Sequence, residues 1–535
     1  MLSLFDTDPN EKRTVTELIE DVDFLTMEIQ ELYCMDQIPW VVGYSGGKDS
    51  TTVLQLVWNA ILNLPKKQRS KPIYVITTDT LVENPIVSSW VKSSLEQMKL
   101  AAKEQEIPIK PHLLYPAVKD TFWVCLIGKG YPSPRVRFRW CTERLKIRPS
   151  ESFIRNIVRS HRLAILVLGT RKAEGTTRAT RMEKYEKGRT RDRFSPYDAN
   201  RPNTQIYLPI EDWSTEDVWL YLMQWKNPWG YSNKDLFSMY RGATADNECP
   251  LVIDTSTPSC GSSRFGCWVC TMVTKDKSME AMIQNDEEKE WMQPLLDIRN
   301  ELDVKNDRNR RDFRRLHGNV HLFERNTKGK ISVASIPGPY TKTWREKWLR
   351  KVLEAQTQIR KTAPPEMRDI TLITLEELSE IRRIWLEEKH EFDDRLPKIY
   401  EEVTGEPFQD VNRTSQSETP LLGADEWGIL KELCDEDEMY FELTTRLLDI
   451  ERQYYTKSKR SGIIGDLEKC FDTSSRSQAE AIQNAYQQRD IQEAIAQADI
   501  STLQQQLSPN DEPLSDNNEP EPKNPTWGSL KFPNQ

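Results

Sequence analysis

The stretch from Ser45 to Ser50, which reads Ser-Gly-Gly-Lys-Asp-Ser, has a composition that suits phosphate binding. Adjacent glycines allow positive φ angles and a close approach of the backbone to a ligand. A lysine adds positive charge, and a helix that begins in such a turn points its free N–H groups at an anion. The Walker A loop has a different spacing, Gly-x-x-x-x-Gly-Lys-Ser/Thr. The stretch therefore predicts a phosphate site of another kind, with a simple tight connection as the alternative for any Gly-Gly pair.

The cysteines form a second set of residues whose spacing suits chemistry. Cys260, Cys267 and Cys270 have the spacing Cys-x6-Cys-x2-Cys in a loop rich in Gly and Ser, and Cys141 is a remote fourth candidate. Four thiolates suit a [4Fe–4S] cluster. Zinc bound by four cysteines is the rival, because spacing alone does not separate the two metals. Cys249 is an alternative ligand to Cys260.

Two further loops carry polar side chains that suit a nucleotide. Asp79 and Thr80 follow an apolar run, a position that favours contacts to a ribose or a base, although Asp79 could equally cap a helix. Gly169 follows a second apolar run, and Arg171 and Arg178 come shortly after it. Arginine offers a planar fork of donors for phosphate. Both loops therefore predict ligand contacts.

Alternating apolar and amphipathic segments must hold these loops in place. The periodicity predicts a helix over 11–36, followed by strands over 40–44, 72–78, 107–114 and 163–169 that alternate with helices over 50–62, 85–103 and 143–160. Such alternation predicts an α/β fold with a doubly wound parallel sheet, whose ligands bind at the carboxyl ends of the strands. Ser214 and Asp217 resemble a capping box at the start of one more helix.

Composition divides the chain of 535 residues into five segments. We expect an N-terminal helix at 1–36, a nucleotide-binding α/β domain at 37–232, a cysteine-rich and helical segment at 233–330, a helical domain at 331–475 and a polar tail at 476–535. The end of the tail is rich in proline and acidic residues and poor in apolar ones. That composition predicts disorder there.

The hydrophobic share of 37% is low, which predicts a soluble protein. No apolar run is long enough for a transmembrane helix, and the first residues lack the features of a signal peptide. We therefore expect a cytoplasmic protein whose nine cysteines are reduced, metal-bound or catalytic rather than paired in disulfides. Ordinary buried cysteines are expected at Cys34, Cys125, Cys434 and Cys470.

Charge is distributed unevenly along the chain. The net charge of -9 argues against a nucleic-acid partner, but residues 129–193 hold 19 Lys and Arg against 6 Asp and Glu. Binding of a phosphate backbone depends on such local fields more than on total charge. Shorter basic clusters occur at 308–315 and 342–351, for which a solvated helix face is the preferred interpretation. The long segment predicts a polyanionic partner.

Five strings occur in order between residues 37 and 230: YSGGKDS, TTDT, RWCTERLKIRP, GTRKAEGTTRA and PIEDWSTEDVWLYL. Together they resemble the phosphoadenosine-phosphosulfate (PAPS) reductase branch of the PP-loop ATP pyrophosphatase superfamily. The resemblance implies that the loop holds pyrophosphate while ATP is cleaved between its α- and β-phosphates and AMP passes to a substrate oxygen. The implied catalytic residues are Lys48, Asp49, Arg171 and Arg178. The implied nucleotide contacts are Ser45, Gly46, Gly47, Lys48, Asp49, Ser50, Asp79 and Gly169.

A longer resemblance covers residues 10–455. The motif order, the cysteine set and two downstream strings, GCWVCTMVTKDKSMEAMI and GPYTKTWREKWLRK, are similar to the DndC family, the iron–sulfur ATP pyrophosphatases of bacterial DNA phosphorothioation. The resemblance implies that sulfur replaces a non-bridging oxygen of the DNA backbone. It implies ATP with Mg²⁺ and a [4Fe–4S] cluster held by Cys141, Cys260, Cys267 and Cys270. The implied partners are DNA, a cysteine desulfurase as sulfur donor, and modification proteins of the DndD and DndE types.

Two other functions stay open at this point. Reductases of PAPS or adenosine phosphosulfate (APS) use a cysteine near the C-terminus in a Glu-Cys-Gly-Leu-His string, which this sequence lacks, since its last cysteine is Cys470 in EKCFDTSS. The other alternative is a nucleotide-binding subunit that acts mainly as an assembly module of a DNA modification complex. Release of pyrophosphate from ATP separates this alternative from the enzymes.

Overall fold

The structure, a computed structural model, describes most of the chain. It covers residues 13–136, 138–176, 179–180, 182–183, 193–195, 203–243, 265–314, 320–327, 330–411, 424–434, 437–455, 460–474, 479–487 and 489–490. The chain divides into two compact units. The first comprises residues 1–319 and 336–475 and holds the large sheet, whereas the second comprises residues 320–335 and 476–535. Within the described ranges, no helix is long and apolar enough to cross a membrane.

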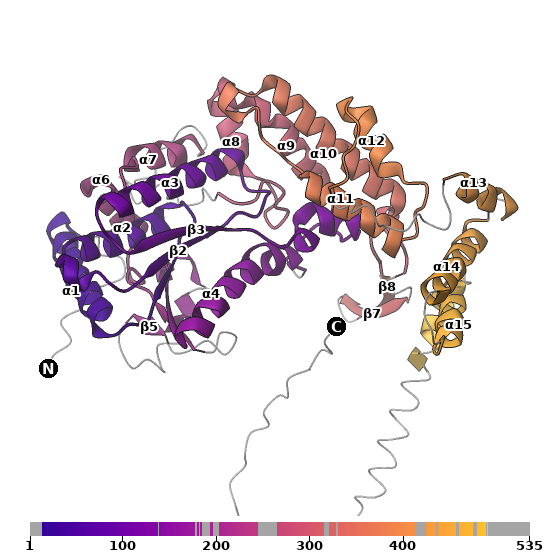
Figure 1. The fold of residues 1–535 in the computed structure, drawn as a ribbon, viewed down its shortest axis with the longest axis horizontal. Coiled ribbons are helices and arrows are strands. Elements are labelled where there is room, and N and C mark those ends of the chain that lie inside the picture. The colour runs from indigo at the N-terminus through magenta and orange to yellow at the C-terminus, as the bar shows by residue number, and fades with distance from the viewer. Residues whose placement is uncertain are drawn as a thin grey trace, which may run out of the picture. The chain divides into compact units, whose positions relative to one another are not determined.

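A six-stranded sheet lies at the centre of the part of the first unit that residues 40–207 form (Figure 1). Its strands are β1 (Trp40–Gly43), β2 (Ile73–Thr78), β3 (Ile109–Leu114), β4 (Ala164–Val167), β5 (Phe194–Ser195) and β6 (Thr204–Tyr207). Their spatial order is β3-β2-β1-β4-β6-β5, and every pair except β5–β6 is parallel. The predicted parallel α/β sheet is confirmed. The two short strands β5 and β6 have no counterpart among the strands that the sequence pattern predicts.

The direction in which the sheet grows reverses at β1. Strands β2 and β3 extend the sheet on one side of β1, and the chain then returns to place β4 on the other side. Trp40 of β1 accordingly lies between Ile73 of β2 and Ile165 of β4. The loops that follow β1 and β4 are therefore neighbours at the carboxyl edge of the sheet, where a crevice forms in folds of this type.

Helices cover both faces of the sheet (Figure 1). The core on one face takes side chains from α1 (Val15–Met35), α2 (Lys48–Leu62), α3 (Pro85–Glu104), α6 (Thr215–Gln224) and α7 (Asn233–Gly242). The other face packs against α4 (Arg148–His161), which follows a π-helical turn, η4 (Thr142–Ile147). Trp40 and Val42 point to the first layer and Val41 to the second, as the two-residue period of a strand requires.

Local chemistry sets several helix boundaries. Ser214 and Asp217 form the predicted capping box at the start of α6. Helix α2 begins at Lys48, earlier than the predicted start at residue 50, because Gly47 already has the extended conformation of an N-cap. Lys48 and Asp49 therefore belong to the first helical turn. This position directs them toward the edge of the sheet.

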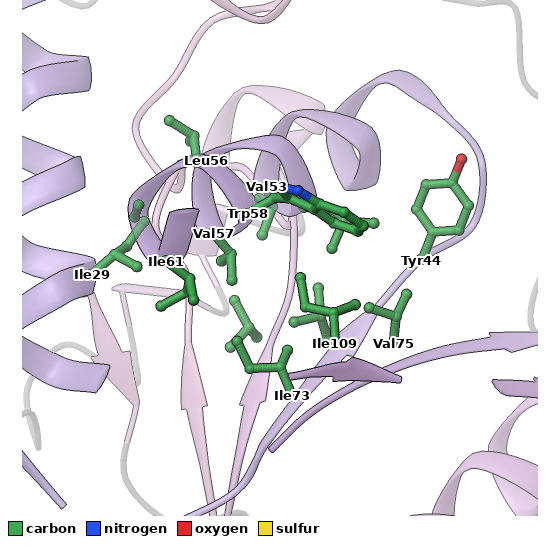
Figure 2. Packing of buried hydrophobic residues seen from close by; sticks show 14 of the residues in the cluster. Ile29, Tyr44, Val53, Leu56, Val57, Trp58, Ile61, Ile73, Val75 and Ile109 are labelled. Atoms are coloured by element: carbon green, nitrogen blue, oxygen red, sulfur yellow. The ribbon is translucent and has the colours of Figure 1, made fainter. Parts of the chain in front are cut away.

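Helix α2 supplies the centre of the core on its face of the sheet. Figure 2 shows side chains of this helix, among them Val57 and Trp58, gathered over Ile73 and Ile109 of the strands. Trp58 is fully buried, and its Nε1 donates to Gln105 Oε1 at 2.7 Å. Full burial of one aliphatic side chain contributes about 1.5–3 kcal/mol relative to exposure. The loop at the start of α2 is therefore attached to a firmly packed helix.

A second hydrophobic core lies among helices that follow Cys267 in the chain. Its helices are α8 (Lys277–Asn285), α9 (Gln293–Leu302), α10 (Lys342–Thr362), α11 (Leu375–Arg383) and α12 (Arg395–Thr404). The buried side chains include Trp123, Trp268 and Trp348. Because Trp123 precedes α4, this core joins the sheet region to the helical region.

The remaining elements follow α12 or lie in the second unit. The helices are α13 (Ala424–Leu433), α14 (Glu438–Tyr455) and α15 (Ile463–Ser474). A two-stranded sheet consists of β7 (His321–Thr327) and β8 (Lys330–Ile336). The polar end of the chain, from residue 491, lies outside the described residues.

Candidate functional site

The loop between β1 and α2 is held together by its own hydroxyl groups. Ser50 Oγ accepts a hydrogen bond from the N–H of Ser45 at 3.1 Å and donates one to the carbonyl oxygen of Gly47 at 3.0 Å. Gly46 has a φ of +74°, which glycine adopts without strain. Among the described residues, no side chain forms an N-cap hydrogen bond at α2. The loop therefore presents the positive end of the helix dipole, a geometry that suits an anion.

Neighbouring atoms lie so close to two backbone positions that only glycine fits there without strain. A Cβ atom on Gly46 would lie 2.4 Å from Val91 Cγ2 of α3. A Cβ atom on Gly169, in the loop after β4, would lie 2.7 Å from the backbone oxygen of Asp49. Backbone atoms cannot move aside as the end of a side chain can. Gly169 therefore lets the two loops at the edge of the sheet touch each other.

We call residues 45–50 the anion loop, and Asp49 of this loop forms an ion pair with Arg171. The side chain of Arg171 is only 1% exposed, and its Nε donates to Asp49 Oδ1 at 2.7 Å. Its Nη1 donates to the carbonyl oxygen of Trp213 at 2.9 Å. The other carboxylate oxygen, Asp49 Oδ2, lies 2.8 Å from Lys48 Nζ. In this arrangement Arg171 positions Asp49, and Asp49 positions the Lys48 ammonium; the catalytic role of Arg171 stays a prediction.

The loops enclose a cavity of about 940 Å³ at the carboxyl edge of the sheet. This volume suits a nucleotide, since ligand pockets measure roughly 300–1,000 Å³. All the predicted nucleotide contacts line it: Ser45, Gly46, Gly47, Lys48, Asp49, Ser50, Asp79 and Gly169. Arg171 also lines the cavity, whereas Arg178 lies outside the described residues. The structure thus brings together side chains that the sequence places in three separate loops.

Tyr240 of α7 contacts the anion loop, and the sequence pattern does not predict this contact. Its hydroxyl group accepts a hydrogen bond from the N–H of Lys48 at 3.3 Å. Burial raises the pKa of Tyr240 above its usual value, so the phenol stays protonated and its O–H can donate a hydrogen bond to a bound anion. Tyr240 follows Lys48 by 192 residues, and no local motif signals such a distant partner.

Two adjacent residues in the turn after β2, Asp79 and Thr80, face different surroundings. Asp79 lines the cavity, accepts a hydrogen bond from the N–H of Leu81 at 2.9 Å and pairs with Lys92 Nζ at 3.0 Å. Leu81 has a φ of +64°, an uncommon conformation for leucine, and such strain concentrates at functional sites. Thr80 instead points to a thiol, with its Oγ1 at 3.4 Å from Cys267 Sγ. The position of Asp79 is therefore consistent with its predicted contact to a nucleotide. Thr80 does not line the cavity and lies beside Cys267 instead.

Glu83 and Lys146 connect the cavity with Cys267. Both residues line the cavity, and Lys146 Nζ lies 3.2 Å from Glu83 Oε1. Cys267 Sγ donates to the same carboxylate oxygen at 3.8 Å. Burial, followed by the charge of Glu83, raises the pKa of Cys267 to about 12. Sequence reasoning missed both residues, although Lys146 lies in the RWCTERLKIRP string.

Cys141 and Cys270 lie in the same region as Cys267. The N–H of Cys270 donates to the carbonyl oxygen of Cys267 at 3.0 Å, so these two cysteines share a tight turn. Thr271 Oγ1 donates to the carbonyl oxygen of Pro134 at 2.6 Å and ties this turn to the segment before Cys141. Burial and then the nearby Cys270 raise the pKa of Cys141. The structure thus brings the remote Cys141 to the Cys267–Cys270 pair.

The predicted ligands of the iron–sulfur cluster are described only in part. Cys260 and its alternative Cys249 lie outside the described residues. Within the described ranges, no group of three or more His, Cys, Asp or Glu side chains is arranged to hold a metal ion. The cluster therefore stays a prediction. Among the other cysteines, Cys34 is exposed, contrary to the expectation of burial, and the remaining three are buried as expected.

Residues 39–272 match the family described as the phosphoadenosine phosphosulfate reductase domain. The matched span is a little under half of the chain and runs from the start of the sheet past Cys270. The match supports placing this domain in the PAPS reductase branch of the PP-loop superfamily. Together with the parallel sheet, it supports an enzyme domain that acts on nucleotides.

Individual relatives are distant. An uncharacterised protein of Methanocaldococcus jannaschii is 28% identical over 201 residues, which are 38% of this chain and 35% of the relative. The chain thus spans about a third of that relative's length. The FMN adenylyltransferase of Candida glabrata is 12% identical, with 44% of this chain and 64% of the other covered and a TM-score of 0.25. Its complex with ATP gives the same coverage and a TM-score of 0.24, and values this low do not establish a shared fold.

Proposed function

We propose that the protein is a sulfurtransferase of DNA phosphorothioation, which uses ATP to activate a DNA backbone phosphate and replaces a non-bridging oxygen by sulfur. The observation that supports this most is the continuity of two sites. The anion loop and the Glu83–Lys146 pair line one cavity, and Glu83 also contacts Cys267. A nucleotide in this cavity would lie beside sulfur chemistry. The match to a sulfonucleotide reductase domain supports the same combination.

In the first step, a non-bridging oxygen of the DNA phosphodiester attacks the α-phosphorus of ATP, and pyrophosphate leaves. Lys48 and the N–H groups at the start of α2 stabilise the charge that develops on pyrophosphate. Arg171 and Asp49 hold the Lys48 ammonium in place before the nucleotide binds. Mg²⁺ is expected on the phosphates, because such clustered charge needs a counter-ion. The product is a mixed anhydride between AMP and the DNA phosphate.

In the second step, a sulfur nucleophile attacks the DNA phosphorus, and AMP leaves with the oxygen that it received. Persulfide chemistry supplies such a nucleophile. When the terminal sulfur of a persulfide attacks, the resulting P–S–S link must be cleaved by a second thiol, which releases the phosphorothioate and forms a disulfide. A cysteine desulfurase is the expected sulfur donor, and proteins of the DndD and DndE types are the expected partners.

The proposed [4Fe–4S] cluster would be held by Cys141, Cys267 and Cys270 with Cys260, or with Cys249 in place of Cys260. Thiolates are the ligands of such clusters, and the three described thiols come from distant segments to one region. When bound, the cluster supplies a redox-active, sulfide-bearing centre beside the nucleotide cavity. The activation of the DNA phosphate depends on Lys48, Asp49 and Arg171.

A sulfonucleotide reductase is the second candidate, because the domain match itself favours it. Such an enzyme would reduce PAPS or APS. The missing Glu-Cys-Gly-Leu-His string and the helices beyond α8 argue against it. A nucleotide-binding assembly subunit of a DNA modification complex is the third candidate.

Two measurements separate these candidates. The purified chain should release pyrophosphate from ATP, and DNA should stimulate the release. Anaerobic incubation with DNA, ATP, cysteine and a cysteine desulfurase, followed by nuclease digestion and mass spectrometry, should then yield phosphorothioate dinucleotides. Sulfite release from PAPS or APS would identify a reductase instead. A chain that binds ATP without releasing pyrophosphate under any of these conditions would be an assembly subunit.

A further inference from the structure

Helix α4 carries a row of arginines that the proposed chemistry does not use. Arg148, Arg155 and Arg159 lie close to one line along the helix, because their separations are near whole numbers of helical turns. Arg162, the C-cap residue, continues the row. Arg155, Arg159 and Arg162 are exposed. We call these four residues the α4 arginine row.

The opposite side of α4 belongs to the core and to the cavity. Ile154 is buried against the sheet, and Phe153 and Val158 pack beside it. At the N-terminal end of the helix, Ser150 and the preceding Lys146 line the cavity. One helix therefore presents arginines to solvent and reaches the nucleotide site with its first turn.

Arg148, at the start of the row, pairs with Asp120 at 3.0 Å and Glu143 at 3.4 Å. Arg155 and Arg159 differ from it and from the basic cluster of residues 342–351. In that cluster, Lys347 and Lys351 both pair with Glu301, at 2.9 and 2.6 Å. By contrast, no described residue forms an ion pair or side-chain hydrogen bond with Arg155 or Arg159. Like charges one turn apart on a helix disfavour folding. Arg155 and Arg159, which have no partner among the described residues, thus do not stabilise the helix.

The spacing of the row suits a nucleic-acid backbone. Helical rise places Arg155 and Arg162 about 10 Å apart along the axis of α4. The same length of duplex axis carries about three phosphates of each DNA strand. Guanidinium groups bind phosphate oxygens through two parallel hydrogen bonds. Among the described residues from 148 to 162, no large apolar side chain is exposed. The row therefore lacks the apolar anchors that a membrane-binding helix needs.

We propose that the α4 arginine row is the surface that binds the DNA backbone and positions it at the cavity. The identity of the polymer as DNA rests on the proposed function, whereas the phosphate backbone as ligand follows from the row itself. A strand on the row would meet the cavity at the first turn of α4, next to Lys146 and Ser150. Within the basic segment 129–193, the proposal assigns DNA binding to these four arginines.

The test compares two charge reversals in the full-length chain. The variant is Arg155→Glu with Arg159→Glu, and the control is Arg360→Glu with Lys361→Glu, two exposed positions at the end of α10 that give the same change in net charge. Binding to a fluorescein-labelled DNA duplex is followed by anisotropy over a series of KCl concentrations. The variant should lower the salt slope of log K by about 1.8, since each lost phosphate contact removes about 0.9. Its affinity at low salt should fall at least about tenfold, and the control should keep the wild-type slope.

Neutral variants and a second readout make the result unambiguous. Arg155→Ala with Arg159→Ala should lower the slope by the same amount with a smaller loss of affinity, because no repulsive charge is introduced. An unchanged slope in both variants would contradict the proposal. Binding of the wild-type chain to phosphatidylserine vesicles but not to DNA would contradict it as well. ATP binding and pyrophosphate release by the wild-type chain are measured in parallel. Their absence would overturn the proposed function while a reduced slope still supported the arginine row.

Discussion

The anion loop lines the cavity, whereas three cysteines, Cys141, Cys267 and Cys270, lie beside it and are connected with it through Glu83. We call these cysteines the thiol group, and the two sites are built in different ways. The loop consists of consecutive residues, and hydrogen bonds among Ser45, Gly47 and Ser50 hold its shape. The thiol group takes Cys141 from the segment before α4, and its other two cysteines come long after α7. A site of consecutive residues depends on local conformation, whereas one of distant segments depends on the packing that joins them. The two sites should therefore respond differently to substitution.

The packing behind the thiol group is the second hydrophobic core. Cys141 and Cys267 both pack against it. The rings of Trp123 and Trp268 lie 5.8 Å apart in this core and bring the two segments together. The anion loop rests instead on α2 and the sheet. This difference predicts that each site can be lost while the other stays intact.

Removal of the lysine from the loop should give the largest effect. Lys48→Ala should reduce pyrophosphate release at least about 100-fold, the effect of losing one preorganised donor to a developing charge. The thiol group should be unaffected, so iron content should equal that of the wild type. Lys103→Ala, at an exposed position of α3, is the control. Near wild-type turnover in Lys48→Ala would remove the loop from the chemistry.

Asp49 is a less selective probe of the same loop. Its loss would leave the nearly fully buried Arg171 without its charge partner. Breaking a buried ion pair in this way costs about 3–5 kcal/mol. Asp49→Ala is thus expected to lower stability together with activity, whereas Lys48→Ala lowers activity alone.

A substitution in the thiol group should give the reverse result. Cys270→Ser should reduce the iron content of anaerobically purified protein from about four per chain, the composition of the proposed cluster, to a small fraction. ATP binding should be retained, because the anion loop does not depend on this cysteine. The exposed Cys34→Ser is the matched control and should keep its iron. Loss of ATP binding in Cys270→Ser would show that the two sites form one structural unit.

Contact between the loops can be tested at Gly169. The Cβ atom of Gly169→Ala would collide with the backbone at Asp49, and such overpacking costs about 1–3 kcal/mol. Gly428→Ala is the control, since a Cβ atom at this exposed position of α13 meets open space. It should raise the free energy of unfolding by about 0.5–1 kcal/mol. Urea unfolding measures both, and equal stabilities would contradict the close approach.

The smallest effect is expected at Tyr240. Tyr240→Phe removes one hydroxyl group from the anion loop, and a hydrogen bond of about 0.5–1.5 kcal/mol corresponds to a two- to tenfold change. We expect the KM for ATP to rise by this factor while kcat stays the same. Tyr115→Phe, at an exposed position beyond β3, should change neither. A fall in kcat alone would give Tyr240 a role in the transition state rather than in binding.

Much of the fold could be predicted because its signals are local. The buried strands β1, β2 and β4 are short apolar runs, and amphipathic segments mark the helices between them. The strands β5 and β6 could not be predicted in the same way. Strand β5 has only two residues, and β6 has four that are only partly apolar. Such strands exist because a neighbouring strand supplies their hydrogen bonds.

The sequence by itself determined the anion loop and its place at the carboxyl edge of a parallel sheet. Glycine conformation, the helix start and the strand before it all depend on residues close in the chain, so a motif can encode them. Only the tertiary structure decided that Arg171 supports Asp49, that Tyr240 reaches Lys48, and that Glu83 and Lys146 join the cavity to Cys267. These contacts join residues far apart in the sequence. Their geometry follows from the packing of two hydrophobic cores, which no local pattern specifies.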